Sequence, residues 1–376
     1  MIYLDNSATT NPKPNAVLQS AGYAMKKYSF NSGRGGYRSS VAAADKIYDV
    51  REKLGAFISF PPQNIAFTQN CTTALNMAIK GSVKKGDHII ISGLEHNAVA
   101  RPVYSLANIG MITYDIAMPG TDQEETLRNF KSLIKSNTSV IICMHASNVF
   151  GCIFPIKELG QLCRERGIRF IVDGAQSVGV LPVSGQTDNM DILCAPGHKG
   201  LYGPMGTGFM AVRDEIKLNT LIEGGTGSSS MDLNQPDAMP DRFESGTLNN
   251  SGIIGLGAGV DCVRRKGVEN IYRHELKFIQ MLYTQLSKNE KAVLYTPYPQ
   301  KDVFAPILSF NYDDYPSEKT ASLLAQRGIA VRAGLHCAPL AHRAFGTMDR
   351  GAVRISPSMF TTERECEIFI NSLKKL

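Results

Sequence analysis

The stretch Ile171-Val172-Asp173-Gly174-Ala175-Gln176 ends an apolar run with a carboxylate, and a lysine follows in the turn Ala195-Pro196-Gly197-His198-Lys199-Gly200. Short β-branched runs like the first alternate with longer amphipathic segments from Gln63 to Arg213. This alternation is typical of βαβ units in a mostly parallel sheet. Because ligands of such sheets bind outside the carboxyl ends of the strands, Asp173 and Lys199 are expected at one binding edge.

Several strands and helices are predicted in this region from runs that turn residues bound. The strands are Ile65–Thr68, His88–Ser92, Ser139–His145, Arg169–Asp173, Asp191–Ala195 and Gly208–Val212. The helices are Thr72–Lys80, Ile156–Arg166 and the segment after Glu95. The sequence thus predicts an α/β fold with one large sheet and helices on both of its faces.

A smaller α+β unit is predicted after residue 250. It has a long helical pattern over Val260–Leu286 and strands near Ala305–Asn311 and Ile329–Arg332. The turn-rich segment Gly224–Asp241 predicts an exposed or partner-contacting loop. The expected domains are an N-terminal segment near the site (1–15), a large α/β domain (16–250) and a small C-terminal domain (251–376). The chain up to residue 60 is expected to pack with the small unit.

The composition is that of an ordinary globular protein, with 376 residues of which 43% are hydrophobic and 20% charged. The net charge of +6 comes without a basic block, so no nucleic acid is expected as a partner. No apolar run is long enough to cross a membrane, and the start Met1-Ile2-Tyr3-Leu4-Asp5 lacks a signal-peptide pattern. The expected compartment is therefore the cytoplasm.

The eight cysteines include no Cys-x-x-Cys pair, so neither a zinc ribbon nor a dithiol redox motif is indicated, and no metal is expected. Cys337 lies in a loop near Arg332 and His336, with Gly334 loosening the backbone. Cationic neighbours favour the reactive thiolate. The alternative, a small buried apolar cysteine, is assigned to the other seven.

A carboxylate at one strand end and a lysine at the exit of the next suit one cofactor, pyridoxal phosphate. Lysine forms a Schiff base with its aldehyde, and aspartate keeps the pyridine nitrogen protonated, which makes the ring an electron sink. The stretch Thr68-Gln69-Asn70-Cys71-Thr72 offers a polar turn before a helix, where backbone N–H groups favour a phosphate. Each piece alone also fits a solvated surface lysine, a helix-capping aspartate or an ordinary threonine cap.

Three more polar residues lie in or after predicted strands. His96 follows Ile89-Ile90-Ile91 and suits stacking on a ring and proton relay, although a histidine in such a loop is more often structural. Asn148 ends another strand and suits a hydrogen bond to cofactor or substrate. Arg354 stands inside a strand pattern, where its planar fork suits the α-carboxylate of an amino acid.

Taken together, these motifs resemble the class V aminotransferase family of pyridoxal-phosphate enzymes, specifically its cysteine desulfurase and selenocysteine lyase-like branch. The resemblance covers nearly the whole chain and includes Tyr3–Thr10, Asn31–Gly36, Arg242–Thr247 and the strand carrying Arg354. It implies the fold type I of pyridoxal-phosphate transferases, with a mostly parallel sheet of the seven-stranded type and a smaller C-terminal α+β domain. It also implies conversion of L-cysteine to L-alanine.

The resemblance assigns roles to matching residues. The implied cofactor-binding residues are Lys199, Asp173 (pyridine nitrogen), Gln176 (ring hydroxyl), His96 (stacking), Asn148, and, around the phosphate, Cys71, Thr72, His198 and, from the second subunit of a homodimer, Thr247. The implied substrate-binding residues are Arg354, Asn148, Ala8 and Arg34. Lys199, His96 and Cys337 are the implied catalytic residues, with Cys337 carrying sulfur as a persulfide for a thiol acceptor, which a partner protein would supply.

Two positions depart from the family pattern. Pro196 stands where many relatives carry Ser or Thr, so one hydroxyl-to-phosphate bond is missing. Cys71 stands where relatives often have threonine, which makes it the second thiol to test. The short loop at Cys337, between Arg332 and Pro339, resembles the group II desulfurases, whose cysteine delivers sulfur poorly without a partner.

Three alternatives stay open at this point. A selenocysteine lyase would use the same site on L-selenocysteine, and a class V aminotransferase would leave Cys337 a spectator. A non-catalytic module of the same fold is the third, against which the intact Lys199, Asp173, His96 and Arg354 argue. Iron–sulfur cluster assembly, thionucleoside formation and selenium metabolism would all use the same site.

Overall fold

A computed structural model describes residues 1–33, 35–228 and 230–376. Its largest element is a seven-stranded sheet in the order β2-β8-β7-β6-β5-β3-β4. The strands are β2 (Ile65–Thr68), β3 (Asp87–Ser92), β4 (Ile112–Ala117), β5 (Thr138–Met144), β6 (Arg169–Asp173), β7 (Ile192–Pro196) and β8 (Gly208–Val212). Strand β8 is antiparallel to both of its neighbours, and the other pairs are parallel. The predicted mostly parallel sheet is confirmed.

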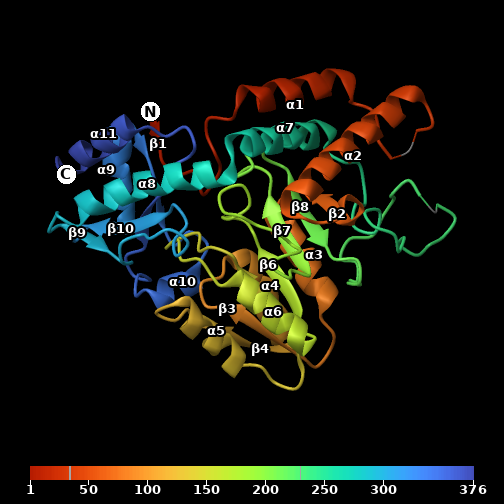
Figure 1. The fold of residues 1–376 in the computed structure, drawn as a ribbon, viewed down its shortest axis with the longest axis horizontal. Helices are drawn as coiled ribbons and strands as arrows, with labels where there is room; N and C mark the ends of the chain where they lie inside the picture. Colours follow the sequence, from red (N-terminus) through yellow and green to blue (C-terminus); the bar gives the residue numbers. More distant parts are fainter. Residues whose placement is uncertain (34, 229) are drawn as a thin grey trace.

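Helices cover both faces of this sheet, as predicted (Figure 1). The elements are α1 (Asn15–Lys27), α2 (Arg38–Ile58), the short 3-10 helix η1 (Pro62–Asn64), α3 (Cys71–Ser82), α4 (Asn97–Asn108), α5 (Gln123–Ser132), α6 (Ile156–Arg166) and α7 (Asn250–Lys266). Successive side chains of a strand point to opposite faces. Accordingly, Phe170 and Val172 of β6 pack in a core with α2, α6 and α7, while Ile171 packs in a second core with α3 and α4.

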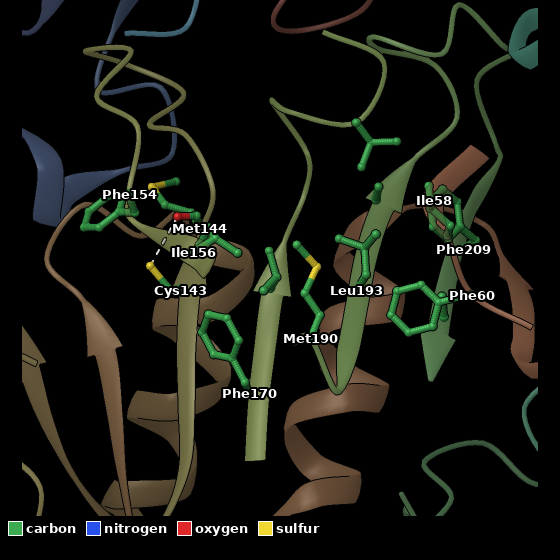
Figure 2. Packing of buried hydrophobic residues seen from close by; sticks show 14 of the residues in the cluster. Ile58, Phe60, Cys143, Met144, Phe154, Ile156, Phe170, Met190, Leu193 and Phe209 are labelled. Atoms are coloured by element: carbon green, nitrogen blue, oxygen red, sulfur yellow. Dashed lines mark hydrogen bonds between the residues drawn. The ribbon is translucent and has the colours of Figure 1, made fainter. Parts of the chain in front are cut away.

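Figure 2 shows part of the first core, where side chains of the central strands meet the end of α2. Phe170, Leu193 and Phe209 come from β6, β7 and β8, and Ile58 and Phe60 reach them from the helix end. These side chains are at most 6% exposed. Their burial fixes β6 and β7, whose end and exit carry Asp173 and Lys199, together with the neighbouring strand β8.

The small unit is built around the sheet β12-β13-β10-β9 and the parallel pair β1-β11. Its elements are β1 (Ile2–Tyr3), α8 (Val268–Leu286), β9 (Ala292–Leu294), β10 (Leu308–Tyr312), α9 (Ser317–Gln326), β11 (Ile329–Ala330), β12 (Arg332–Gly334), α10 (Pro339–Ala344), β13 (Ala352–Ile355) and α11 (Glu363–Leu373). Both chain termini lie beside this unit (Figure 1). Among the described residues, no helix is both long and apolar enough to cross a bilayer.

Three features differ from the sequence expectations. The prediction of one long helix over Val260–Leu286 is wrong. Gly267 adopts a φ of 83° and separates α7 from α8. Strand β4 was not among the predicted strands. Of the chain up to residue 60, β1 pairs with β11 of the small unit, whereas α1 and α2 pack against α7. The domain boundaries themselves stay a prediction.

A buried ion pair ties the large domain together. The Arg51 guanidinium of α2 donates to both carboxylate oxygens of Glu244, at 2.7 and 2.9 Å, and Glu244 also accepts from the Phe67 N–H at 2.6 Å. Both charged side chains are about 5% exposed. This geometry joins α2 and β2 to the segment Arg242–Thr247.

We expect Glu244→Ala to lower the free energy of unfolding by about 3 kcal/mol, since it leaves a buried guanidinium unpaired. Glu124→Ala removes the exposed pair with Arg128 and should cost less than about 1 kcal/mol. Urea unfolding of the two variants beside wild type measures the difference. Equal shifts of the two transitions would contradict the prediction.

Candidate active site

The carboxyl ends of β3, β5, β6 and β7 meet at one cavity, as the sheet topology requires. The lining residues are Asn70, Cys71, Thr72, Leu75, His96, Ala98, Met144, Ala146, Asn148, Asp173, Ala175, Gln176, Pro196, His198 and Lys199. Eight of the predicted site residues are therefore brought together: Cys71, Thr72, His96, Asn148, Asp173, Gln176, His198 and Lys199.

Asp173 and Lys199 carry the charges of this cavity. Asp173 is 3% exposed, and burial raises the pKa of its carboxyl, although Oδ1 accepts from the Ala175 N–H at 2.8 Å. Burial also lowers the pKa of the Lys199 amine. Among the described residues, no ion pair joins the two groups and Lys199 has no hydrogen-bond partner through its amine. The carboxyl and the amine thus line the same cavity without direct ion-pair contact.

Two buried polar atoms of the lining residues have no hydrogen-bond partner within the described chain. They are Nδ1 of His198 and Oδ1 of Asn148. Next to them, α3 begins at Cys71, where Asn70 caps the helix by accepting from the Thr73 N–H at 2.9 Å. An unpaired lysine, a buried acid, an unsatisfied histidine and a helix N-terminus fit pyridoxal phosphate. The residues present therefore suit this cofactor.

His96 is the N-cap of α4, because its Nδ1 accepts from the Ala98 N–H at 3.0 Å. Nδ1 is thereby the acceptor, and the proton of the neutral ring lies on Nε2. Burial, then the nearby charge of Lys199, lowers the pKa of His96 to about 4. His96 is a neutral imidazole of fixed tautomer at neutral pH.

The turn that carries Lys199 is fastened to the N-terminal segment. The His198 carbonyl accepts from the Lys13 ammonium at 2.8 Å and from the Thr10 N–H at 3.1 Å. Burial lowers the pKa of Lys13 to about 8. Sequence reasoning missed Lys13, whose only signal is its place just after the motif Tyr3–Thr10.

Cys337 lies on the loop between β12 and α10, and its side chain is exposed. His336 and Cys337 both adopt left-handed φ values, 51° and 55°, which cost about 1–2 kcal/mol for residues with a Cβ. Two bonds hold them: the Asn97 N–H donates to the Cys337 carbonyl at 2.7 Å, and the Asn148 amide donates to the His336 carbonyl at 3.0 Å. The loop is therefore tied to Asn148, which lines the cavity, and to Asn97, which stands between the lining residues His96 and Ala98.

Arg354 of β13 is buried and already has partners. It donates to Asp5 at 2.6 Å and to the Asn148 carbonyl at 2.9 Å, while its Nε has no partner. The prediction from sequence did not foresee the ion pair with Asp5. A bound carboxylate would share this guanidinium with Asp5. Arg332, missed as a site residue, adds positive charge, since it lowers the pKa of His96 and Lys199.

Other predicted residues lie apart from the cavity. Thr247 lines a second hollow beside Thr68 and Thr73, and Ala8 lies in an N-terminal turn where its N–H donates to the Asp5 carbonyl. Arg34 lies outside the described residues. Pro196 pairs with Gly208 at the end of β7. Its side chain has no hydroxyl to offer at this position.

A second buried acid, Glu95, stands directly before His96 and was also missed. It is fully buried and accepts from the Ser92 hydroxyl at 2.6 Å and the Met144 N–H at 2.8 Å through one oxygen. Its other oxygen has no partner, and burial raises its pKa to about 8. Glu95 therefore links the loop after β3 to the end of β5 as a neutral acid.

Glu95→Gln keeps the acceptor oxygen but does not titrate. Because the native pKa of Glu95 lies above its ordinary value of 4.5, its contribution to stability is full at acid pH and is lost as the pH rises to about 8. We expect the stability of the variant, relative to wild type, to rise by about 2 kcal/mol or more between pH 5 and pH 8. Urea unfolding at both pH values measures this, and parallel pH dependences would contradict it.

Fold and site together define an α/β enzyme that works at the carboxyl edge of its sheet, with an acid and a lysine on neighbouring strands. The family model of the class-V aminotransferases matches residues 2–369, and the chain belongs to this family. The resemblance seen in the sequence is thereby confirmed. Members of this family are pyridoxal-phosphate enzymes.

Relatives of known name cover the full chain. A probable cysteine desulfurase of Methanothermobacter thermautotrophicus is 31% identical over 100% of this chain and 94% of its own length. The cysteine desulfurase of Escherichia coli O8 is 32% identical over 100% of this chain and 93% of its own length. The apo structure of a cysteine desulfurase from Thermococcus onnurineus NA1 has a TM-score of 0.91 at 30% identity, covering 100% of this chain and 94% of that one. The predicted fold type I is confirmed.

Proposed function

We propose that this chain is a pyridoxal-phosphate-dependent cysteine desulfurase, which converts L-cysteine to L-alanine and retains the sulfur as a persulfide on Cys337. The observation that carries this proposal is the position of Cys337. Its thiol is exposed, while its backbone is bonded to Asn97 and, through His336, to Asn148 at the cavity. An aminotransferase needs no thiol there.

Each residue has a task that follows from its surroundings. The cofactor, when bound, supplies an electron sink for the bonds to the substrate Cα. Lys199 would hold it covalently and, once displaced by the substrate amine, serve as a base, because burial favours the neutral amine. Asp173 would bind the pyridine nitrogen and His198 the phosphate. Arg354 and Asn148 would hold the substrate carboxylate.

The sulfur step joins the thiol of Cys337 to the sulfur of the substrate. The Cys337 thiolate attacks the substrate sulfur, the Cβ–S bond breaks, and a S–S bond forms on Cys337. The electron pair of the broken bond stays on the carbon fragment, which takes up a proton and leaves as alanine. An acceptor thiolate then attacks the outer sulfur of the persulfide, the S–S bond breaks, and Cys337 is released as a thiolate. The exposed position of Cys337 leaves it accessible to such an acceptor on a partner protein.

A cysteine-dependent assay for alanine and sulfide tests the proposal on the purified yellow holoenzyme. Wild type should be active, and Lys199→Ala and Cys337→Ala should fall below about 1% of its rate. Cys262→Ala is the matched control, since Cys262 lies on α7 away from the cavity. Full desulfuration by Cys337→Ala would sink the proposal, and transamination by that variant would favour an aminotransferase.

Selenocysteine lyase is the nearest alternative, because it needs the same site. Parallel assays with L-cysteine and L-selenocysteine rank the two substrates on wild type. If Cys337→Ala retains activity on L-selenocysteine and loses it on L-cysteine, the thiol serves desulfuration alone. A cytoplasmic location and a role in iron–sulfur cluster assembly stay predictions.

We also propose a homodimer whose sites are shared. Thr247 lies away from the cofactor cavity of its own chain. In the loop Gly224–Asp241, Met231 and Leu233 are fully exposed, an arrangement that suits burial by a second copy.

Mixed dimers test the sharing. Lys199→Ala chains supply an intact Thr247, and Thr247→Val chains supply an intact Lys199. We expect dimers that combine the two to desulfurate L-cysteine faster than either variant alone, since one of their two sites is whole. A monomeric mass in light scattering, or no gain on mixing, would contradict the shared site.

A further inference from the structure

The cysteine loop is joined to a chain of buried polar side chains that the reaction above does not use. The rings of His336 and His342 lie parallel, at 8° with centroids 5.6 Å apart, and His336 Nδ1 is 3.4 Å from His342 Nε2. On the far side, His342 Nδ1 lies 2.7 Å from the Thr347 hydroxyl. The three side chains are at most 3% exposed.

One assignment of protons satisfies every atom of this chain. The Thr347 hydroxyl donates to His342 Nδ1, His342 Nε2–H donates to His336 Nδ1, and His336 Nε2–H donates to the Arg332 carbonyl at 3.4 Å. Both rings are neutral, because burial lowers the pKa of His336 to about 2 and also lowers that of His342. Because the Arg332 carbonyl can only accept, His336 Nε2 carries the proton, which fixes the tautomers of both histidines and makes the Thr347 hydroxyl the last donor of the series.

This series of hydrogen-bonded side chains ends at a turn where the backbone is strained. His336 and Cys337 are consecutive non-glycine residues in the left-handed region, a conformation that persists only where the surroundings enforce it. Asn148 holds the His336 carbonyl and Asn97 holds the Cys337 carbonyl. A backbone bond from the Ala338 N–H to the Leu335 carbonyl, at 2.9 Å, closes the turn. The His336 side chain adds a further hold, which His342 anchors from α10.

We propose that His342 is a positioning residue for sulfur transfer: through His336 it keeps Cys337 in the left-handed turn that directs the exposed thiol to the substrate sulfur. His342 itself is buried and lies outside the residues that line the cofactor cavity. The proposal rests on the proposed function, in which Cys337 is the nucleophile.

The packing of His342 permits a clean substitution. Its ring meets the edge of Phe150 at 5.8 Å between centroids, and Phe150 in turn stacks on Phe345 at 3.9 Å. His342→Phe therefore places an aromatic ring in an aromatic pocket and removes both nitrogen atoms. His342→Gln restores a donor at the position of Nε2. His274→Phe, on the small unit at α8, is the control for the same change elsewhere, since His274 bonds to the Thr361 carbonyl.

We expect His342→Phe to lower kcat for desulfuration about tenfold or more, since a small misplacement of a reacting group is costly. His342→Gln should stay within about threefold of wild type, and His274→Phe within about twofold. KM for L-cysteine and the absorbance change on adding L-cysteine should stay unchanged in all three variants, because substrate binding to the cofactor does not need the thiol. The alkylation rate of Cys337 by iodoacetamide, followed by mass spectrometry, should change in His342→Phe alone.

The outcomes separate this inference from the proposed function. If Cys337→Ala abolishes desulfuration while His342→Phe matches His274→Phe, only the inference fails. A His342→Phe variant that loses cofactor absorbance or raises KM also overturns it, since the role is then general packing. If His342→Phe does not fold, Thr347→Val removes the hydroxyl that contacts His342 Nδ1 and the His342 carbonyl, keeps both histidine rings, and should still slow kcat by about threefold with KM unchanged. A Thr347→Val variant indistinguishable from wild type would then refute the positioning role of His342.

Discussion

The site depends on two opposite charges that the sheet keeps apart. Asp173 ends β6 and Lys199 leaves β7, and the parallel pairing of these strands fixes their carboxyl ends side by side. Without an ion pair between them, burial raises the pKa of the acid and lowers that of the amine. Among the described residues, Asp173 therefore has no cationic partner within 4 Å and the Lys199 amine has no hydrogen-bond partner, so a ligand at the cavity would supply both. The strand register sets the space that such a ligand must fill.

Around these charges, the loops are bonded to one another rather than only to their own strands. Glu95 joins the loop after β3 to the end of β5, and Lys13 joins the N-terminal segment to the turn of Lys199. Asn148, after β5, holds the cysteine loop of the small unit and is itself held by Arg354. The two units of the chain are thus coupled at the site. A substrate carboxylate at Arg354 would act on the same network that positions Cys337.

The sequence predicted the elements that depend on local patterns, but few of the contacts between residues that are distant in the sequence. The bounds of β2, β6, β8 and α6 follow from their apolar runs, because burial of a strand or helix face leaves a periodic pattern. Strand β4 lies at the sheet edge with several partly exposed residues, so its pattern is weaker. The partnership of Arg354 with Asp5 joins residues almost a whole chain apart, and nothing local to either residue indicates it. The same holds for Lys13, whose bond to the His198 carbonyl joins residues 185 positions apart. His342 contacts residues close to it in the sequence, His336 and Thr347, but only the fold brings these side chains together.

Burial decides which of the thiols is available for sulfur chemistry. All eight cysteines lie in the described part of the chain, and Cys337 alone among them is exposed. Burial raises the pKa of the Cys71 thiol well above its ordinary value, and Asp173, 3.7 Å away, opposes a second negative charge there. Cys71 is therefore a neutral neighbour of the acid, although it lies closer to the cofactor residues. In the proposed reaction the nucleophile is therefore Cys337, whose side chain is open to the substrate while its backbone is held by a bond from Asn97 and, at the neighbouring His336, by a bond from Asn148.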